Sequence, residues 1–204
     1  MRIYQEALAD LVRGKDLAER ATGYARFVVN HVTTDHFSLP TPCRPWDMWT
    51  LLAHVNDSLA ALCEGIEHRR LALAPAPPAP GGGDVLAAFR HLSTRLLESW
   101  TGAGRRGGDR LVEVGGTPLH GLVLAGTGAL EIVVHGWDIA RTCGADCVIP
   151  DALAADLYDF ARVVVGPTDR RPQFADPVPV TASATPGDRL VAYLGRDPNL
   201  VLRR

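Results

Sequence analysis

The chain has 204 residues, of which 47% are hydrophobic and 22% are charged, and its formal net charge is −2 at pH 7. This length and composition predict one globular domain with a substantial core. The lack of a basic balance argues against nucleic acid as a partner, and the charged, amphipathic first ten residues do not have the pattern of a signal peptide.

Helical periodicity dominates the first half of the chain. Apolar residues recur at helical spacing from Tyr4 to His31 and again from Asp47 to His68. Between these two predicted helices, Phe37 to Pro45 is a loop punctuated by prolines. The proline- and glycine-rich stretch from Ala74 to Gly83 cannot continue a helix, so it predicts a linker or a crossover.

Two further long helices are expected. Asp84 is a suitable N-cap for a third helix that ends near Trp100. Arg110 to Val114 predicts a short extended segment. Thr117-Pro118 is typical of a helix start with proline in the first turn, so we expect the fourth helix to begin there and to end near Cys143, just before a glycine.

The last part of the chain predicts two shorter helices, Asp151 to about Val165 and Pro186 to Leu194, separated by a proline-broken stretch. The pattern as a whole indicates an all-α fold with four principal helices, and the long crossover is compatible with a bundle. We expect this helical bundle over residues 1–166, with an extra N-terminal helical segment, and a short, partly irregular C-terminal extension over residues 167–204 packed on it.

Pro118 to Ala140 is the most apolar stretch, but it carries two histidines, a glutamate and an aspartate, which argues against a transmembrane span. Four cysteines are too few for a disulfide scaffold, so Cys143 and Cys147 are expected to be reduced thiols near a helix end. We therefore expect a soluble cytoplasmic protein, a monomer or a homodimer, whose partner is a small-molecule substrate and neither nucleic acid nor a membrane.

Glu131 and His135 stand four residues apart within this apolar stretch. On a helix that spacing places both side chains on one face, about 6 Å apart. A carboxylate and an imidazole on an apolar face are costly to bury unless something satisfies them. A divalent metal ion would do so, and His54 on the second predicted helix offers a third ligand.

Two histidines and one glutamate leave a tetrahedral ion one ligand short, which is typical of catalytic sites. Zinc suits this ligand set best, and nickel, iron or manganese are not excluded. The open position would hold water or a substrate atom, whose pKa the ion would lower. The competing interpretation is chance, since isolated Glu-x-x-x-His pairs are common on helix surfaces.

Neighbouring residues extend this candidate site. Asp138 follows His135 by three residues and could orient the imidazole, or it could pair with Arg141 on the surface; the spacing leaves both interpretations open. Trp46 begins the helix that carries His54, which makes it a candidate for the substrate pocket.

Several stretches taken together resemble a known family. They are Thr41-Pro42-Cys43-Arg44-Pro45-Trp46, Leu51-Leu52-Ala53-His54, and the run from Glu131 to Arg141. In these the chain is similar to the mycothiol-dependent maleylpyruvate isomerase type of the DinB-like superfamily. Phe174 to Val180 and Asp188 to Pro198 resemble a metal-binding branch of that group common in actinobacteria. The resemblance extends over most of the chain from about Asp35 onward.

This resemblance implies a DinB-like four-helix bundle with an ion bound at one end of its core by His54, Glu131 and His135. It implies an enzyme that isomerises a small electrophile or transfers mycothiol, a low-molecular-weight thiol, onto it. The first segment is longer than usual, the Ala74 to Gly83 loop is richer in proline, and the tail is shorter than the C-terminal domain of the isomerase. Arg196 could be a remnant of the arginine contacts that this domain makes with substrate.

Three functions remain open from the sequence. The first is a metal-dependent enzyme acting on a small organic electrophile. The second is a non-catalytic metal-binding or sensing protein, and the third is a divergent biosynthetic or resistance enzyme on the same bundle. The lack of an obvious fourth protein ligand favours an enzyme over a closed binding site. No catalytic residue beyond the metal ligands is assigned.

Overall fold

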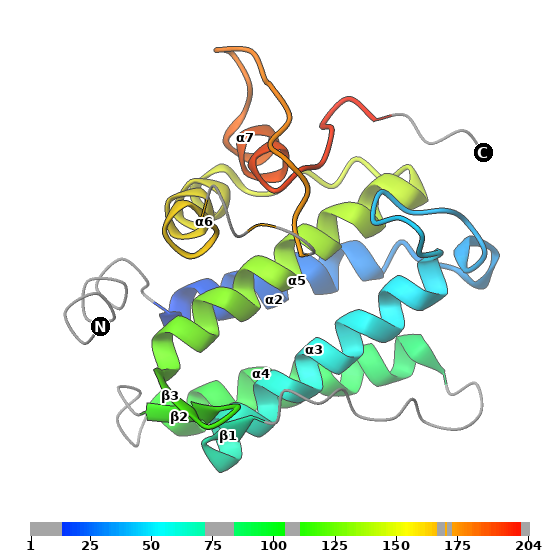
Figure 1. The fold of residues 1–204 in the computed structure, drawn as a ribbon. Helices are drawn as coiled ribbons and strands as arrows, with labels where there is room; N and C mark the ends of the chain where they lie inside the picture. The colour runs from blue at the N-terminus through cyan, green and yellow to red at the C-terminus, as the bar shows by residue number, and fades with distance from the viewer. Residues whose placement is uncertain (1–13, 72–83, 105–110, 167–169, 171–172, 201–204) are drawn as a thin grey trace.

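Four long helices form the centre of the fold. The computed structural model describes residues 14–71, 84–104, 111–166, 170 and 173–200. The four helices are α2 (Gly14–Val29), α3 (Met48–His68), α4 (Val85–Gly104) and α5 (Gly121–Cys143). α2 packs along α5, α3 packs against both α4 and α5, and α2 also contacts α4, so the helices enclose one core (Figure 1). The expected all-α, DinB-like bundle is confirmed.

Capping residues account for where these helices begin and end. Oδ1 of Asp47 accepts the backbone N–H of Thr50 at 2.8 Å at the start of α3, and Oδ1 of Asp84 accepts two backbone N–H groups, each at 3.0 Å, in the first turn of α4. α5 ends at Cys143 and is capped by Gly144, whose φ of 65° suits glycine. Residues 4–13 of the first predicted helix and the linker from Ala74 to Gly83 lie outside the described residues.

The expected start of the fourth helix is wrong. Thr117–His120 is strand β3, which pairs antiparallel with β2 (Leu111–Val114), and β1 (Arg70–Leu71) pairs in parallel with β2. Gly115 and Gly116 both have positive φ, 55° and 85°, and turn the chain sharply between β2 and β3. Strand pairing therefore satisfies the backbone around Pro118, and α5 begins only at Gly121. The extended segment expected before the two glycines is confirmed over Leu111–Val114.

A second layer lies over α5. It consists of α6 (Asp151–Val164) and α7 (Pro186–Tyr193), which pack on each other, and α6 also contacts α5 and α2 (Figure 1). Both helices were expected. Beyond α7, the tail returns to α5, where Nη2 of Arg141 donates to the backbone oxygens of Pro198 and Leu200 at 3.1 and 2.8 Å. The division into units at residue 166 stays a prediction.

α5 is the central helix of the bundle, with α2, α3 and α6 against it. By length and composition Gly121–Cys143 could cross a membrane, but 83% of its most apolar window is buried inside the protein, as in the core helix of a folded domain. Glycines on α5 allow the neighbouring helices α3 and α2 to pack close to its backbone. A Cβ on Gly128 would lie 2.5 Å from the side chain of Leu62 on α3, and one on Gly136 would lie 3.0 Å from the ring of Tyr24 on α2.

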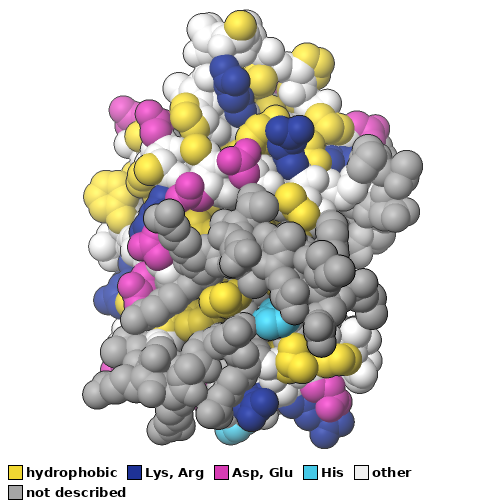
Figure 2. All heavy atoms as spheres, turned by 90° about the vertical axis from the view of Figure 1, so that its left-hand side faces the viewer, with side chains coloured by type: hydrophobic (Ala, Val, Ile, Leu, Met, Phe, Trp, Pro, Cys, Tyr) yellow, Lys and Arg dark blue, Asp and Glu magenta, His cyan; other side chains and the backbone are white. Residues whose placement is uncertain are grey.

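The surface mixes charges of both signs. Figure 2 shows one face on which Lys and Arg side chains lie among Asp, Glu and hydrophobic side chains. This mixture agrees with the net charge of −2. The described part of this face therefore carries no extended field of a single sign.

Candidate metal centre

The packing of α3 against α5 brings His54, Glu131 and His135 together. Nε2 of His54 lies 2.7 Å from Oε1 of Glu131, and Nε2 of His135 lies 3.2 Å from the same oxygen. The two imidazole rings are nearly perpendicular, at 87°, with centroids 5.0 Å apart. One donor atom from each residue lies within 4.8 Å of the other two. The three candidate ligands thus converge on one point.

This cluster is closed on one side and open on the other. The side chain of His135 is only 6% exposed, because it faces the core of the bundle, whereas those of His54 and Glu131 are 35% and 34% exposed. The exposed edge of the cluster therefore lies on the side of His54 and Glu131.

The electrostatics of the cluster favour a separated charge pair. Burial acts to raise the pKa of Glu131, but hydrogen bonds from His135 and His54 outweigh it and hold this pKa well below its usual range. Burial acts to lower the pKa of His135, but Asp138 and Glu131 outweigh it and raise this pKa to about 9. Without an ion, these pKa directions favour a carboxylate beside a protonated imidazole, and a metal cation could take the place of that proton.

Asp138 supports His135 from behind the cluster. Its Oδ2 lies 3.0 Å from Nδ1 of His135 and accepts a hydrogen bond from Nη2 of Arg196 at 3.2 Å. The side chain of Asp138 is completely buried. Nδ1 of His135 is occupied by this contact, which leaves Nε2 facing Glu131. The geometry is that of an orienting acceptor, and the alternative of a surface pair with Arg141 is wrong because Asp138 is not on the surface.

The two candidate arginines, Arg141 and Arg196, lie differently with respect to the cluster. The guanidinium of Arg141 lies 5.5 Å from the ring centroid of Trp137 and binds backbone oxygens of the tail, so it does not reach the cluster. Arg196 lies on that tail and reaches the centre through Asp138. This contact depends on how the tail returns over α5, which no spacing in the sequence indicates.

The loop before α3 covers the imidazoles. The ring centroid of Trp46 lies 4.7 Å from that of His54 and 6.2 Å from that of His135. Thr41 is fully buried and holds the loop, since its N–H and its hydroxyl both donate to the backbone oxygen of Trp46, at 3.1 and 2.9 Å. The same loop places Cys43 beside His135 and Asp138. Sequence reasoning did not nominate Cys43, and its closeness to Trp46 in the chain was the available signal.

The donor set fits a divalent cation. A carboxylate and two imidazoles are the ligands that zinc accepts in catalytic sites. The residue behind His135 supplies the outer hydrogen bond that usually accompanies a ligand histidine. Within the described ranges, no fourth protein donor joins His54, Glu131 and His135. A coordination position would therefore be left for water or a substrate on the exposed side.

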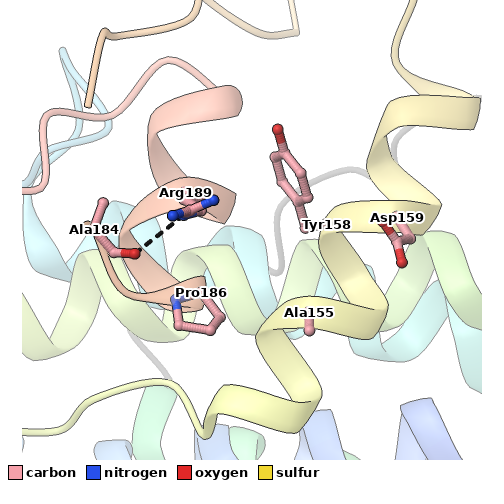
Figure 3. Close-up of a pocket in the computed structure, with 6 residues that line it drawn as sticks. All are labelled: Ala155, Tyr158, Asp159, Ala184, Pro186 and Arg189. Carbon is pink, nitrogen blue, oxygen red and sulfur yellow. Dashed lines mark hydrogen bonds between the residues drawn. The ribbon is translucent and has the colours of Figure 1, made fainter. Parts of the chain in front are cut away.

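A separate hollow lies between α6 and α7 (Figure 3). It has a volume of about 290 Å³ and is lined by Ala155, Tyr158, Asp159, Ala184, Pro186 and Arg189. Its polar groups do not converge. Nε of Arg189 donates to the backbone oxygen of Ala184 at 3.1 Å, and Asp159 points away from the ring of Tyr158 (Figure 3). We assign no chemistry to this hollow.

Comparison with known proteins identifies the family. Residues 18–140 match the model of the mycothiol maleylpyruvate isomerase N-terminal domain, and since this is more than half of the chain, the chain belongs to that family. The crystal structure of the mycothiol-dependent maleylpyruvate isomerase has the same fold, with a TM-score of 0.55 and 18% identity over 71% of this chain and 68% of that one. The family that the sequence motifs resemble is thereby confirmed.

Two relatives match along most of their length. They are Uncharacterized protein MT0763 of Mycobacterium tuberculosis (strain CDC 1551 / Oshkosh) and Uncharacterized protein Rv0738 of Mycobacterium tuberculosis (strain ATCC 25618 / H37Rv). Each is 28% identical to this chain over 183 residues, which cover 87% of this chain and 94% of the relative. The similarity therefore extends beyond the matched domain.

Proposed function

We propose that this protein is a metal-dependent enzyme that acts on a small organic electrophile with a low-molecular-weight thiol of the mycothiol type. The reaction is isomerisation of the electrophile or transfer of the thiol onto it. The observation that carries the proposal is the single oxygen of Glu131 that faces Nε2 of both His54 and His135. Membership of the family supports the thiol and the isomerase class.

His54, Glu131 and His135 would hold the ion, with zinc as the first choice and nickel, iron or manganese as alternatives. When bound, such an ion supplies a Lewis acid that lowers the pKa of a coordinated thiol or water and polarises a substrate oxygen. Zinc, the cytoplasmic location, a monomeric or homodimeric state, and the absence of nucleic acid and membrane partners are parts of this proposal.

The residues around the ligands have distinct roles in this proposal. Asp138 occupies Nδ1 of His135, so the other ring nitrogen is presented to the cluster. Arg196 compensates the charge of the buried aspartate. Trp46 covers the two imidazoles and excludes water from their faces. Substrate and thiol enter from the exposed side of His54 and Glu131.

Elemental analysis tests the metal site. It is applied to the wild type and to His54→Ala and Glu131→Ala, with circular dichroism on each variant. We expect about one zinc per chain in the wild type, loss of the metal in both variants, and unchanged helicity. His91→Ala, which removes an exposed histidine on α4, is the matched control and should keep the metal. A metal-free wild type, purified without chelators, would contradict the proposal.

A turnover assay tests the chemistry. The metal-loaded protein is incubated with mycothiol and a panel of small unsaturated acids, and both free thiol and substrate geometry are followed by NMR. We expect turnover by the wild type and none by Glu131→Ala. Metal binding without any turnover, together with unfolding on chelation, would favour the binding or sensing alternative.

A further inference from the structure

The loop that carries Trp46 also brings a thiol to the centre. Cys43 is half-buried, whereas the other three cysteines of the chain are buried. The Sγ atom of Cys43, one ring nitrogen of His135 and one carboxylate oxygen of Asp138 all lie within 4.8 Å of one another. This second cluster shares His135 with the first.

Backbone hydrogen bonds hold Cys43 in this position. Its carbonyl oxygen accepts the N–H of Trp46 at 3.0 Å and lies 3.3 Å from the hydroxyl of the buried Thr41. The thiol is thus placed by the same short turn that places the indole of Trp46 over the imidazoles. Its closeness to His135 and Asp138 follows from a formed loop with defined hydrogen bonds.

Asp138, a member of this second cluster, has one carboxylate oxygen without a hydrogen-bond partner in the described part of the chain. Its Oδ2 is engaged by His135 and Arg196, but Oδ1 is buried and has no hydrogen-bond partner among the described residues. A buried carboxylate oxygen without a partner costs free energy. A cation that displaces the thiol proton of Cys43 and binds between this thiolate and Asp138 would satisfy it.

We propose that Cys43, His135 and Asp138 form a second donor set, for a thiophilic divalent cation, that overlaps the first set at His135. A thiolate is a soft ligand, so this set prefers soft or borderline cations such as cadmium(II) over magnesium or calcium. Because His135 belongs to both sets, a cation on Cys43 draws this imidazole away from His54 and Glu131. Thiophilic cations would therefore inhibit the enzyme. This inhibition rests on the proposed function, whereas the second donor set itself does not.

Cadmium is the probe for this site. Metal-free protein is titrated with cadmium(II), and the ultraviolet sulfur-to-cadmium charge-transfer band is followed. The test variant is Cys43→Ser, and the matched control is Cys147→Ser. In the native protein the Cys147 thiol also lies beside an imidazole, since its Sγ is 3.8 Å from Nδ1 of His31. We expect the band in the wild type and in the control. In Cys43→Ser we expect loss of the band.

The outcomes for the two donor sets can be told apart with Glu131→Gln. Glu131 belongs only to the first set, so this variant should lose zinc and keep the charge-transfer band. An undiminished band in Cys43→Ser, or cadmium binding to the wild type without a band, overturns the second set. A wild type that is purified without any divalent metal ion but shows the Cys43 band with cadmium would overturn the proposed function alone. Circular dichroism checks that each variant is folded.

Discussion

Nδ1 of His135 lies 3.0 Å from Oδ2 of Asp138, one turn further along α5, at a point where Asp138 is completely buried. The same oxygen accepts from Arg196, which comes from 58 residues further along the chain. The orientation of a candidate metal ligand therefore depends on a buried acid and, through it, on the tail of the protein.

Asp138→Asn keeps the size of the side chain but removes the charge that holds His135. We expect the affinity for zinc to fall by about 10–100-fold, because the imidazole loses its orienting partner. Competition with a chromophoric chelator measures this affinity. Asp156→Asn, which removes an exposed partner of Arg20 on the surface, is the control and should bind zinc like the wild type. Equal affinities of the two variants would refute the role of Asp138.

Arg196→Met is expected to destabilise the fold, because it leaves the buried carboxylate of Asp138 without its guanidinium partner. The side chain of Arg196 is only 11% exposed, so the free energy of unfolding should fall by about 3 kcal/mol in urea denaturation. The double variant Asp138→Asn/Arg196→Met should lose less than the sum of the two single changes. Strict additivity would show that the two residues are not coupled.

The pH dependence of stability can be tested at Glu67, which accepts hydrogen bonds from Nε of Arg95 at 3.0 Å and from the hydroxyl of Ser99 at 2.6 Å. These contacts lower the pKa of Glu67 from 4.5 to about 2. A lowered carboxyl pKa adds stability above pH 4.5, and this contribution is lost as the pH falls through about 2. The pair is partly solvated, so the contribution should be about 0.5–1 kcal/mol.

The measurement is the difference in unfolding free energy between the wild type and Glu67→Gln, followed by urea denaturation from neutral to acidic pH. We expect this difference to shrink as the pH falls across that range. Glu98→Gln, at an exposed glutamate on α4, is the control and should show a small difference with no such trend. A difference for Glu67→Gln that stays constant into acid would rule out the ion pair as its source.

Substitution of two glycines by alanine is expected to change the free energy of unfolding in opposite directions. Gly128→Ala would place a Cβ 2.5 Å from Leu62 in the packed interface of α3 and α5, so we expect a loss of about 1–3 kcal/mol. Gly23→Ala on the exposed face of α2 meets nothing within 4 Å, so we expect a gain of about 0.5–1 kcal/mol from helix propensity. Urea denaturation measures both, and changes of the same sign would contradict this description of the bundle.

A helix start that sequence reasoning misplaced, that of α5, shows where local signals fail. Thr117-Pro118 has the residues of a helix start, yet it lies in β3 because its backbone pairs with Glu113 and Val114 across a glycine turn. A proline at the first helical turn is a local preference, whereas strand pairing joins segments whose meeting depends on the whole fold. By contrast, the N-cap at Asp84 was predicted correctly because an N-cap needs only its own first turn.

The sequence by itself determined the helices of the bundle and the pairing of Glu131 with His135 on one face of α5, because both follow from hydrogen bonds and side-chain directions within a few residues. It nominated His54, but only the packing of α3 on α5 brought that imidazole to Glu131, from 77 residues away. The tertiary structure alone placed Cys43 beside Asp138 and Arg196 behind it. Contacts of this kind depend on which surfaces of distant segments are buried together, and no spacing along the chain encodes that.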